Sequence, residues 1–122
     1  MSDFPEAWRN TLIGPVKFDQ AKAKSVLDYG PLRRVLELAV AQAESGKGAD
    51  RHSLGLCFLQ QPIMAITRHH GVAFATGQAA KKGHEAALMV ERKEWDRAKA
   101  ELLGSIVYSA AAFLVIDERS NG

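Results

Sequence analysis

The fold is decided by the stretch WDRAKAELLGSIVYSAAAFLVI, which covers residues 95–116. Its apolar residues recur at steps of three and four, the spacing of one face of a long helix. The face comprises Trp95, Ala98, Leu102, Ile106, Ala110, Phe113 and Ile116. A helix this apolar over its second half should be covered on most sides, so we expect it at the centre of a helical bundle or at a dimer interface.

Small residues are concentrated in the same stretch, at Gly104, Ser105, Ser109 and residues 110–112. Their lack of bulk allows the backbone of another helix to come close. No glycine or proline lies between His84 and Leu103, which leaves open a helix that runs unbroken from the preceding one.

The rest of the chain also favours helices. We expect them over residues 20–29, over residues 32–45 after Pro31, from Pro62 to Gly71, and over a small-residue segment at 79–87. Residues 53–61 are ambiguous, and residues 72–77 are expected to be a short strand-like segment or a connection. The predicted fold class is all-α: a bundle of four to five helices, completed by oligomerisation. Residues 1–17 are expected to form an irregular arm, residues 18–118 the helical domain and residues 119–122 a disordered tail.

Charge and composition indicate a cytoplasmic protein. The chain has 122 residues and a net charge of +2, with acidic and basic residues interleaved, whereas nucleic-acid binding usually requires a one-sided basic patch. The longest uncharged run, from Leu102 to Ile116, is shorter than the ~20 apolar residues of a membrane helix, and the first residues lack the pattern of a signal peptide. We therefore expect a homo-oligomer, most simply a dimer, and neither a membrane nor a nucleic-acid partner.

The single cysteine and the histidines give weak catalytic signals. Cys57 lies in an apolar run and is predicted to be a small buried residue, because a nucleophile needs a positioned base and His52 is near only in sequence. Consecutive helical residues point ~100° apart, so His69 and His70 are poorly placed to share a metal ion. They suit the end of a helix before Gly71, where the helix dipole favours cations.

Cationic residues suggest a ligand. The free amides at the start of a helix near Gly77 attract phosphate, although the segment is not a P-loop. If the loop at residues 47–52 lies beside the end of the Pro62 helix, their cations converge into one pocket for a nucleotide-like or other anionic small molecule. The predicted contacts are Arg51, His52, Arg68, His69, Gln78, Lys81 and Lys82. The leading hypothesis is a cytosolic helical binding or regulatory protein with no resident cofactor.

A second hypothesis comes from a resemblance. The pieces that carry it are RVLELA at residues 34–39, Arg68-His69, and ELLGSIVY at residues 101–108. In these pieces the chain resembles the small all-α nucleotide pyrophosphohydrolases, the MazG-like and phage dATP/dGTP pyrophosphohydrolase-like groups. The resemblance implies a metal-dependent enzyme that holds magnesium or manganese through Glu37, Glu91, Glu94 and Glu101.

The chain departs from the metal motif of that family, ExxE followed by ExxD. Glu91 and Glu94 are the candidate for the first half, but Ser105 stands near where the second half needs an acid, and no ExxD occurs. Arg92, Lys93 and Arg97 are interleaved with these acids, so ion pairs on a wet helix face are the simpler interpretation. A related chain would then keep the scaffold without the reaction.

A third hypothesis is a phage-type interaction or inhibitor module without a small-molecule ligand. It predicts an exposed apolar patch, and the N-terminal arm with Trp8 and Phe18 is its expected contact surface.

Overall fold

The computed structural model describes residues 28–45 and 54–121. Contacts divide the chain into two units, residues 1–31 and residues 32–122, which are described separately. In the first unit, the Gly30 N–H donates a 2.9 Å hydrogen bond to the Asp28 carboxylate. The arm predicted at residues 1–17 and the helix predicted at residues 20–29 lie outside the described residues. The described residues form helices and no strand, so the all-α fold class is confirmed.

The first described helix, α3, spans Gly30–Ser45 and confirms the helix predicted after Pro31. Proline is well placed in a first helical turn, because its missing N–H would have no partner there. Ala39 is the buried residue of α3, whereas its five large apolar residues are exposed, at Leu32, Val35, Leu36, Leu38 and Val40. The helix therefore forms, but most of its apolar surface is uncovered.

A short 3-10 helix, η1 (Phe58–Gln60), leads into α5 (Pro62–His70), as Pro62 and Gly71 predict. Gly71 ends α5 with φ 104°, a conformation that favours glycine, and its N–H donates to the Thr67 carbonyl. The next helix, α6 (Val72–Glu91), begins directly after it. The prediction of a strand-like segment at residues 72–77 is therefore wrong: these residues form the first turns of α6, because a single left-handed glycine suffices for the change of direction.

The last helix, α7 (Trp95–Asn121), is separate from α6. A turn at Lys93, with φ 61°, separates the two helices, and the Glu94 N–H donates to the Met89 carbonyl within it. The chain thus reverses without glycine or proline, and the two helices do not form the continuous helix that the sequence left open. The helix also includes residues 119–121, where we expected a disordered tail. Asn121 Nδ2 donates to the Asp117 carboxylate at 2.9 Å in this last turn.

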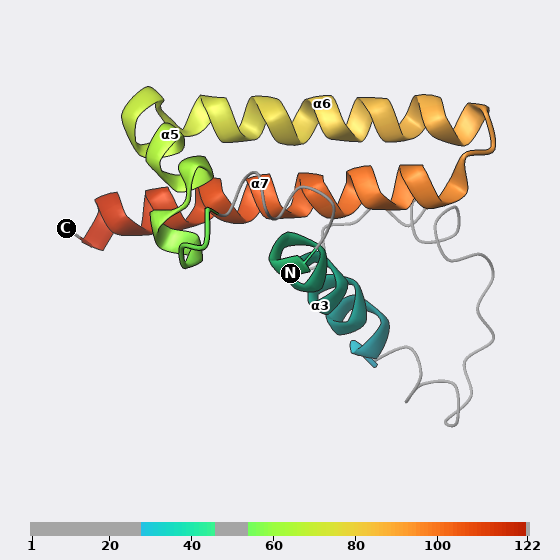
Figure 1. Cartoon of the computed structure of the whole chain (residues 1–122), viewed down its shortest axis with the longest axis horizontal. Helices are drawn as coiled ribbons and strands as arrows, with labels where there is room; N and C mark the ends of the chain where they lie inside the picture. Colours follow the sequence, from blue (N-terminus) through green and yellow to red (C-terminus); the bar gives the residue numbers. More distant parts are fainter. Residues whose placement is uncertain (1–27, 46–53, 122) are drawn as a thin grey trace, which may run out of the picture. The chain divides into compact units, whose positions relative to one another are not determined.

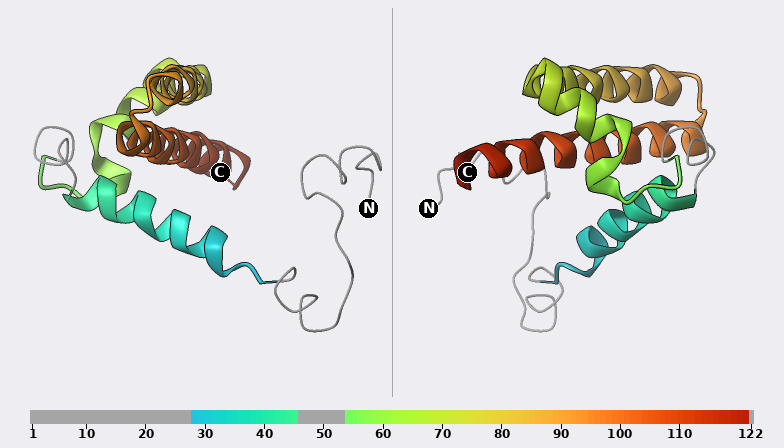
Figure 2. Two further views of the ribbon diagram at one scale, coloured as in Figure 1. Left: turned by 90° about the vertical axis from the view of Figure 1, so that its right-hand side faces the viewer. Right: turned by 60° about the vertical axis from the view of Figure 1, so that its left-hand side comes forward.

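Helices α6 and α7 lie side by side and antiparallel, as Figures 1 and 2 show. The buried residues of their hairpin are predominantly alanines: Ala75, Ala86, Ala98, Ala111 and Ala112. Ser105 Oγ donates a 2.8 Å hydrogen bond to the Ala79 carbonyl across the interface. A side-chain hydroxyl reaches a backbone carbonyl of a neighbouring helix only when the two backbones are close, which the small residues allow.

A second cluster ties α5 to the C-terminal half of α7. Met64, Ala111 and Val115 are almost completely buried there, with Phe58 and Leu114 packed beside them. Thr67 is also buried, and its hydroxyl donates to the Ile63 carbonyl at 2.6 Å, which satisfies the polar group within α5.

The close packing of α6 and α7 predicts that no side chain larger than alanine fits at position 86 without separating the helices. The bond between Ser105 and Ala79 sets a register that brings Ala86 level with Ala98, and both are buried. Ala86→Leu should separate the helices and lower the free energy of unfolding by about 1–3 kcal/mol, measured by urea denaturation followed by circular dichroism. The matched control is Ala87→Leu, at the next, exposed position of the same helix. Equal stability of the two variants would contradict close packing.

Candidate functional site

The Arg68 guanidinium is engaged by a carboxylate. Its Nε and Nη2 donate to the two oxygens of Glu118 on α7, at 2.9 and 2.8 Å. Arg119 adds a 3.2 Å hydrogen bond to the Arg68 carbonyl. The Arg68 guanidinium therefore joins the end of α5 to the end of α7. An anionic ligand at Arg68 would have to displace the Glu118 carboxylate.

The predicted lysines are paired as well. Lys82 Nζ lies 3.5 Å from the Glu101 carboxylate on α7 and 5.9 Å from the centre of the Tyr108 ring. Lys81 Nζ lies 3.9 Å from Glu85, one turn along α6. Lys82 is ten residues into α6, so about 15 Å of helix separates it from the end of α5. The structure does not bring these lysines together with Arg68.

The other predicted ligand contacts are dispersed. His69 is exposed, and its ring meets that of His70 edge to face, with centroids 4.7 Å apart. Gln78 is half-buried on α6. Arg51 and His52 lie outside the described residues. The anionic-ligand site stays a prediction, and the described geometry adds no convergence of cations to support it.

The four glutamates of the enzyme hypothesis lie on different elements. Glu37 is on α3 and Glu91 ends α6, while Glu94 in the turn accepts a 2.6 Å hydrogen bond from Arg97. Glu101 faces Lys82 as described above. Within residues 28–45 and 54–121, no group of three or more His, Cys, Asp or Glu side chains could hold a metal ion. The metal-dependent alternative stays a prediction.

The prediction that Cys57 is buried is wrong, because the side chain is exposed. Cys57 precedes η1 and its thiol is hydrogen-bonded to the Gln60 side chain. The local chain is folded by the tight 3-10 turn, in which the Gln60 N–H donates to the Cys57 carbonyl at 2.9 Å. In the apolar run at residues 56–59, Leu56, Cys57 and Leu59 are thus exposed, whereas Phe58 packs against the buried cluster of α5 and α7.

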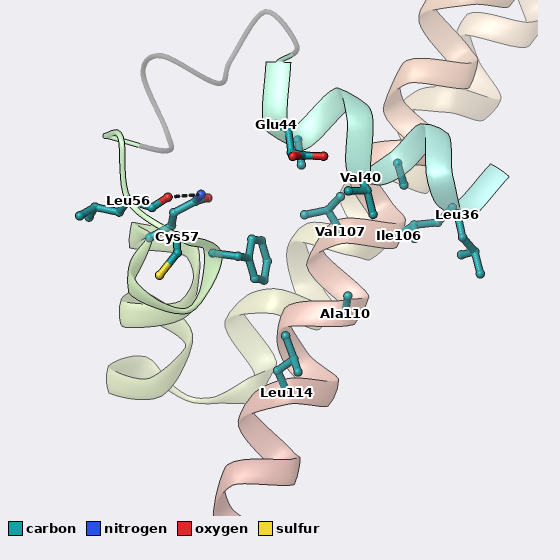
Figure 3. A pocket seen from close by; sticks show the side chains of 13 residues that line it. Leu36, Val40, Glu44, Leu56, Cys57, Ile106, Val107, Ala110 and Leu114 are labelled. Atoms are coloured by element: carbon teal, nitrogen blue, oxygen red, sulfur yellow. Dashed lines mark hydrogen bonds between the residues drawn. The ribbon is translucent and has the colours of Figure 1, made fainter. Parts of the chain in front are cut away.

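That run forms one wall of an apolar pocket of about 640 Å³, which the sequence analysis missed (Figure 3). A second wall is α3, whose Gln42 Nε2 donates a 3.0 Å hydrogen bond to the Ala100 carbonyl of α7, and α7 forms the floor. Glu44 is the charged residue of the lining. The lining residues are Leu36, Ala39, Val40, Ala43, Glu44, Leu56, Cys57, Phe58, Gln61, Ile106, Val107, Ala110 and Leu114. The lining favours an apolar ligand over an anion.

A second apolar surface follows α7 along its length. We call it the outer stripe, and it consists of four exposed residues: Trp95 (55% exposed), Leu102 (48%), Phe113 (69%) and Ile116 (54%). Within the described residues of a single chain this face of α7 is not covered, so the expectation of a helix covered on most sides, in a bundle or at a dimer interface, stays a prediction that needs a partner. The small residues explain which face of α7 is covered. Helix α6 packs on the alanine face, and the face that carries the outer stripe stays exposed.

By length and composition alone, α7 is also a candidate for crossing a membrane: it has 27 residues, and little of its most apolar part is buried. The uncharged run from Leu102 to Ile116 would span about 22 Å as a helix, against about 30 Å for the hydrocarbon core of a bilayer.

No family model, curated protein or solved structure matches this chain. The resemblance to MazG-like pyrophosphohydrolases stays a prediction. The function is therefore argued from the two apolar surfaces and the paired charges.

The pair of Arg68 and Glu118 predicts a pH dependence of stability. The hydrogen bond from Arg68 lowers the pKa of Glu118 below its ordinary value of 4.5, and the nearby positive charges of Arg68 and Arg119 act in the same direction. A carboxylate with a depressed pKa stabilises the fold above its ordinary pKa, and this contribution is lost as the pH falls through the folded-state value.

Glu118→Gln removes the titrating group, so the variant should unfold at a lower temperature than the native chain at neutral pH. The difference between the two unfolding temperatures should shrink as the pH falls below about 4.5. Thermal melts at a series of pH values test this. A difference that stays constant down to about pH 2 would contradict the assigned pair.

Proposed function

We propose that this chain is a helical interaction module that binds another helix along the outer stripe of α7. The observation that carries the proposal is the distribution of apolar side chains on this helix. Small residues, together with Tyr108 and the ion-paired Glu101, face α6. Trp95, Leu102 and Phe113 lie on another face of α7 and are about half exposed or more. The large side chains are thus displayed on the surface of a helix whose other face is already packed.

The free energy gained by burying apolar side chains supports the binding of a partner helix. Burial of one Leu, Ile or Phe side chain stabilises a complex by about 1.5–3 kcal/mol, and the four residues of the stripe share one face of a single helix. Contiguous apolar surfaces on a folded chain usually mark interaction sites. Of the three hypotheses from the sequence, the interaction module has the most support from the described residues, with its contact surface on α7.

Site-specific photo-crosslinking tests the proposal. With p-benzoylphenylalanine in place of Phe113, irradiation of the cells that express the chain should yield a discrete crosslinked protein band. The matched control carries the same group at Ala87, which is exposed on α6 away from the stripe. Equal crosslinking at both positions, or none at Phe113, would contradict a docking surface on α7.

The pocket favours a second candidate function, the binding of an apolar small molecule. The leading hypothesis from the sequence included a small-molecule ligand, and the pocket of about 640 Å³ supports such a ligand with different chemistry. A cavity of this size lies within the usual range for ligand sites, about 300–1,000 Å³.

A neutral apolar fluorophore such as N-phenyl-1-naphthylamine tests this second function. Ala110→Phe places a ring in the pocket that Ala110 lines, so it should abolish most of the fluorescence increase. Phe113→Ser is the control, because it changes the outer stripe and leaves the pocket lining intact. Loss of the signal in Phe113→Ser alone would assign the probe to the stripe and contradict binding in the pocket.

A further inference from the structure

The outer stripe belongs to a heptad series. Lys99, Ile106 and Ser109 lie between its members, and the full series runs Trp95, Lys99, Leu102, Ile106, Ser109, Phe113, Ile116. The steps alternate between four and three residues over the whole length of the series. This is the spacing of the contact positions of a left-handed coiled coil, which needs a partner that is also a long helix.

The length of the stripe selects the partner. From Trp95 to Ile116 the series extends about 32 Å along the axis, so a helix of similar length is required to cover it. Among the described elements, α6 and α7 have 20 and 27 residues, and the others are shorter. Helix α6 already packs on the alanine face of the same α7. A second α7, from another copy of this chain, has both the length and the matching apolar series.

Charge complementarity favours an antiparallel over a parallel pairing of the two α7 helices. Lys99 is a contact position of the series, and Asp117 directly follows the contact position Ile116. In an antiparallel pair centred between Ile106 and Ser109, Lys99 of each copy stands level with Ile116 of the other and so lies beside its Asp117. Within the described residues neither side chain has an oppositely charged partner. A parallel, in-register pair would instead bring Lys99 against Lys99.

Side-chain sizes agree with the antiparallel direction. When Lys99 stands level with residues 116 and 117 of the second copy, Ile106 stands level with Ser109 and Leu102 with Phe113. The same register places Trp95 beside Ser120. Large residues therefore meet small ones at two layers, whereas the parallel register stacks Trp95 on Trp95 and leaves a gap between two copies of Ser109. Filled layers without voids are the condition for tight packing.

We propose that two copies of this chain pair through antiparallel α7 helices, with Lys99 of each copy opposite Asp117 of the other. This inference rests on the proposed function, because it names the helix that the outer stripe binds. The two pairs of charges lie at the ends of the apolar contact, where they determine direction and register more than affinity.

Disulfide trapping tests the direction. Cys57 is exposed, so the experiment uses a Cys57→Ser background. Chains with Leu102→Cys and chains with Phe113→Cys, distinguished by a mass tag, are mixed in equal amounts and oxidised gently. The antiparallel register predicts that disulfides join unlike chains. Disulfides between like chains would overturn the antiparallel direction and leave the docking function of the stripe in place.

Charge exchange tests the register by sedimentation equilibrium. Lys99→Asp and Asp117→Lys should each weaken dimerisation by about tenfold, because each change creates two like-charge pairs per dimer. The double variant should regain most of the native affinity. Absence of rescue would overturn the pairing of Lys99 with Asp117.

A native chain that remains monomeric at all concentrations would overturn the inference altogether. If Phe113 still crosslinked to a different protein, the proposed function would stand without self-association. If Phe113 crosslinked to nothing, the proposed function would fail as well.

Discussion

The close approach of α6 and α7 is the constraint on which the rest of this structure depends. The hydrogen bond from Ser105 to the Ala79 carbonyl requires two backbones in near contact, and the alanines around it make that contact possible. The Phe74 and Tyr108 rings also meet across the two helices, with centroids 6.2 Å apart, whereas Trp95, Leu102 and Phe113 stay exposed on another face of α7. The interface that holds the hairpin together thereby determines which residues remain at the surface.

Two consequences follow for function. One face of α7 displays the exposed apolar residues of the outer stripe, and a neighbouring face of the same helix forms the floor of the pocket beside α3. Two of the cations that the sequence suggested for an anionic ligand are paired with carboxylates of α7: Arg68 on α5 with Glu118, and Lys82 on α6 with Glu101. The stripe and the pocket therefore offer a partner or ligand mainly apolar side chains.

Much of the helical architecture could be predicted, because proline and glycine act through local backbone geometry. Pro62 and Gly71 bound α5 for reasons that depend on no other part of the chain. The turn at Lys93 could not be predicted in this way, since a lysine with positive φ carries no such signal. Nor could the paired state of Arg68 and Lys82, which depends on carboxylates contributed by α7 from far along the sequence.

What covers the apolar face of α7 could not be predicted from the sequence. Periodicity correctly indicated a long helix with one apolar face, but it cannot say which surface covers that face. The small residues of the same segment explain which face α6 covers, because they let its backbone come close to that side of α7. The pocket was missed for a related reason: its walls come from three segments that the sequence does not show to be neighbours.

The central claim is that α7 is covered by a second copy of itself, and the concentration dependence of thermal unfolding tests it most directly. Association in the folded state alone raises the unfolding temperature as the protein concentration rises. We predict a steady increase between about 1 and 100 μM for the native chain, and none for Phe113→Glu. An unfolding temperature of the native chain that stays constant over this range would contradict the claim.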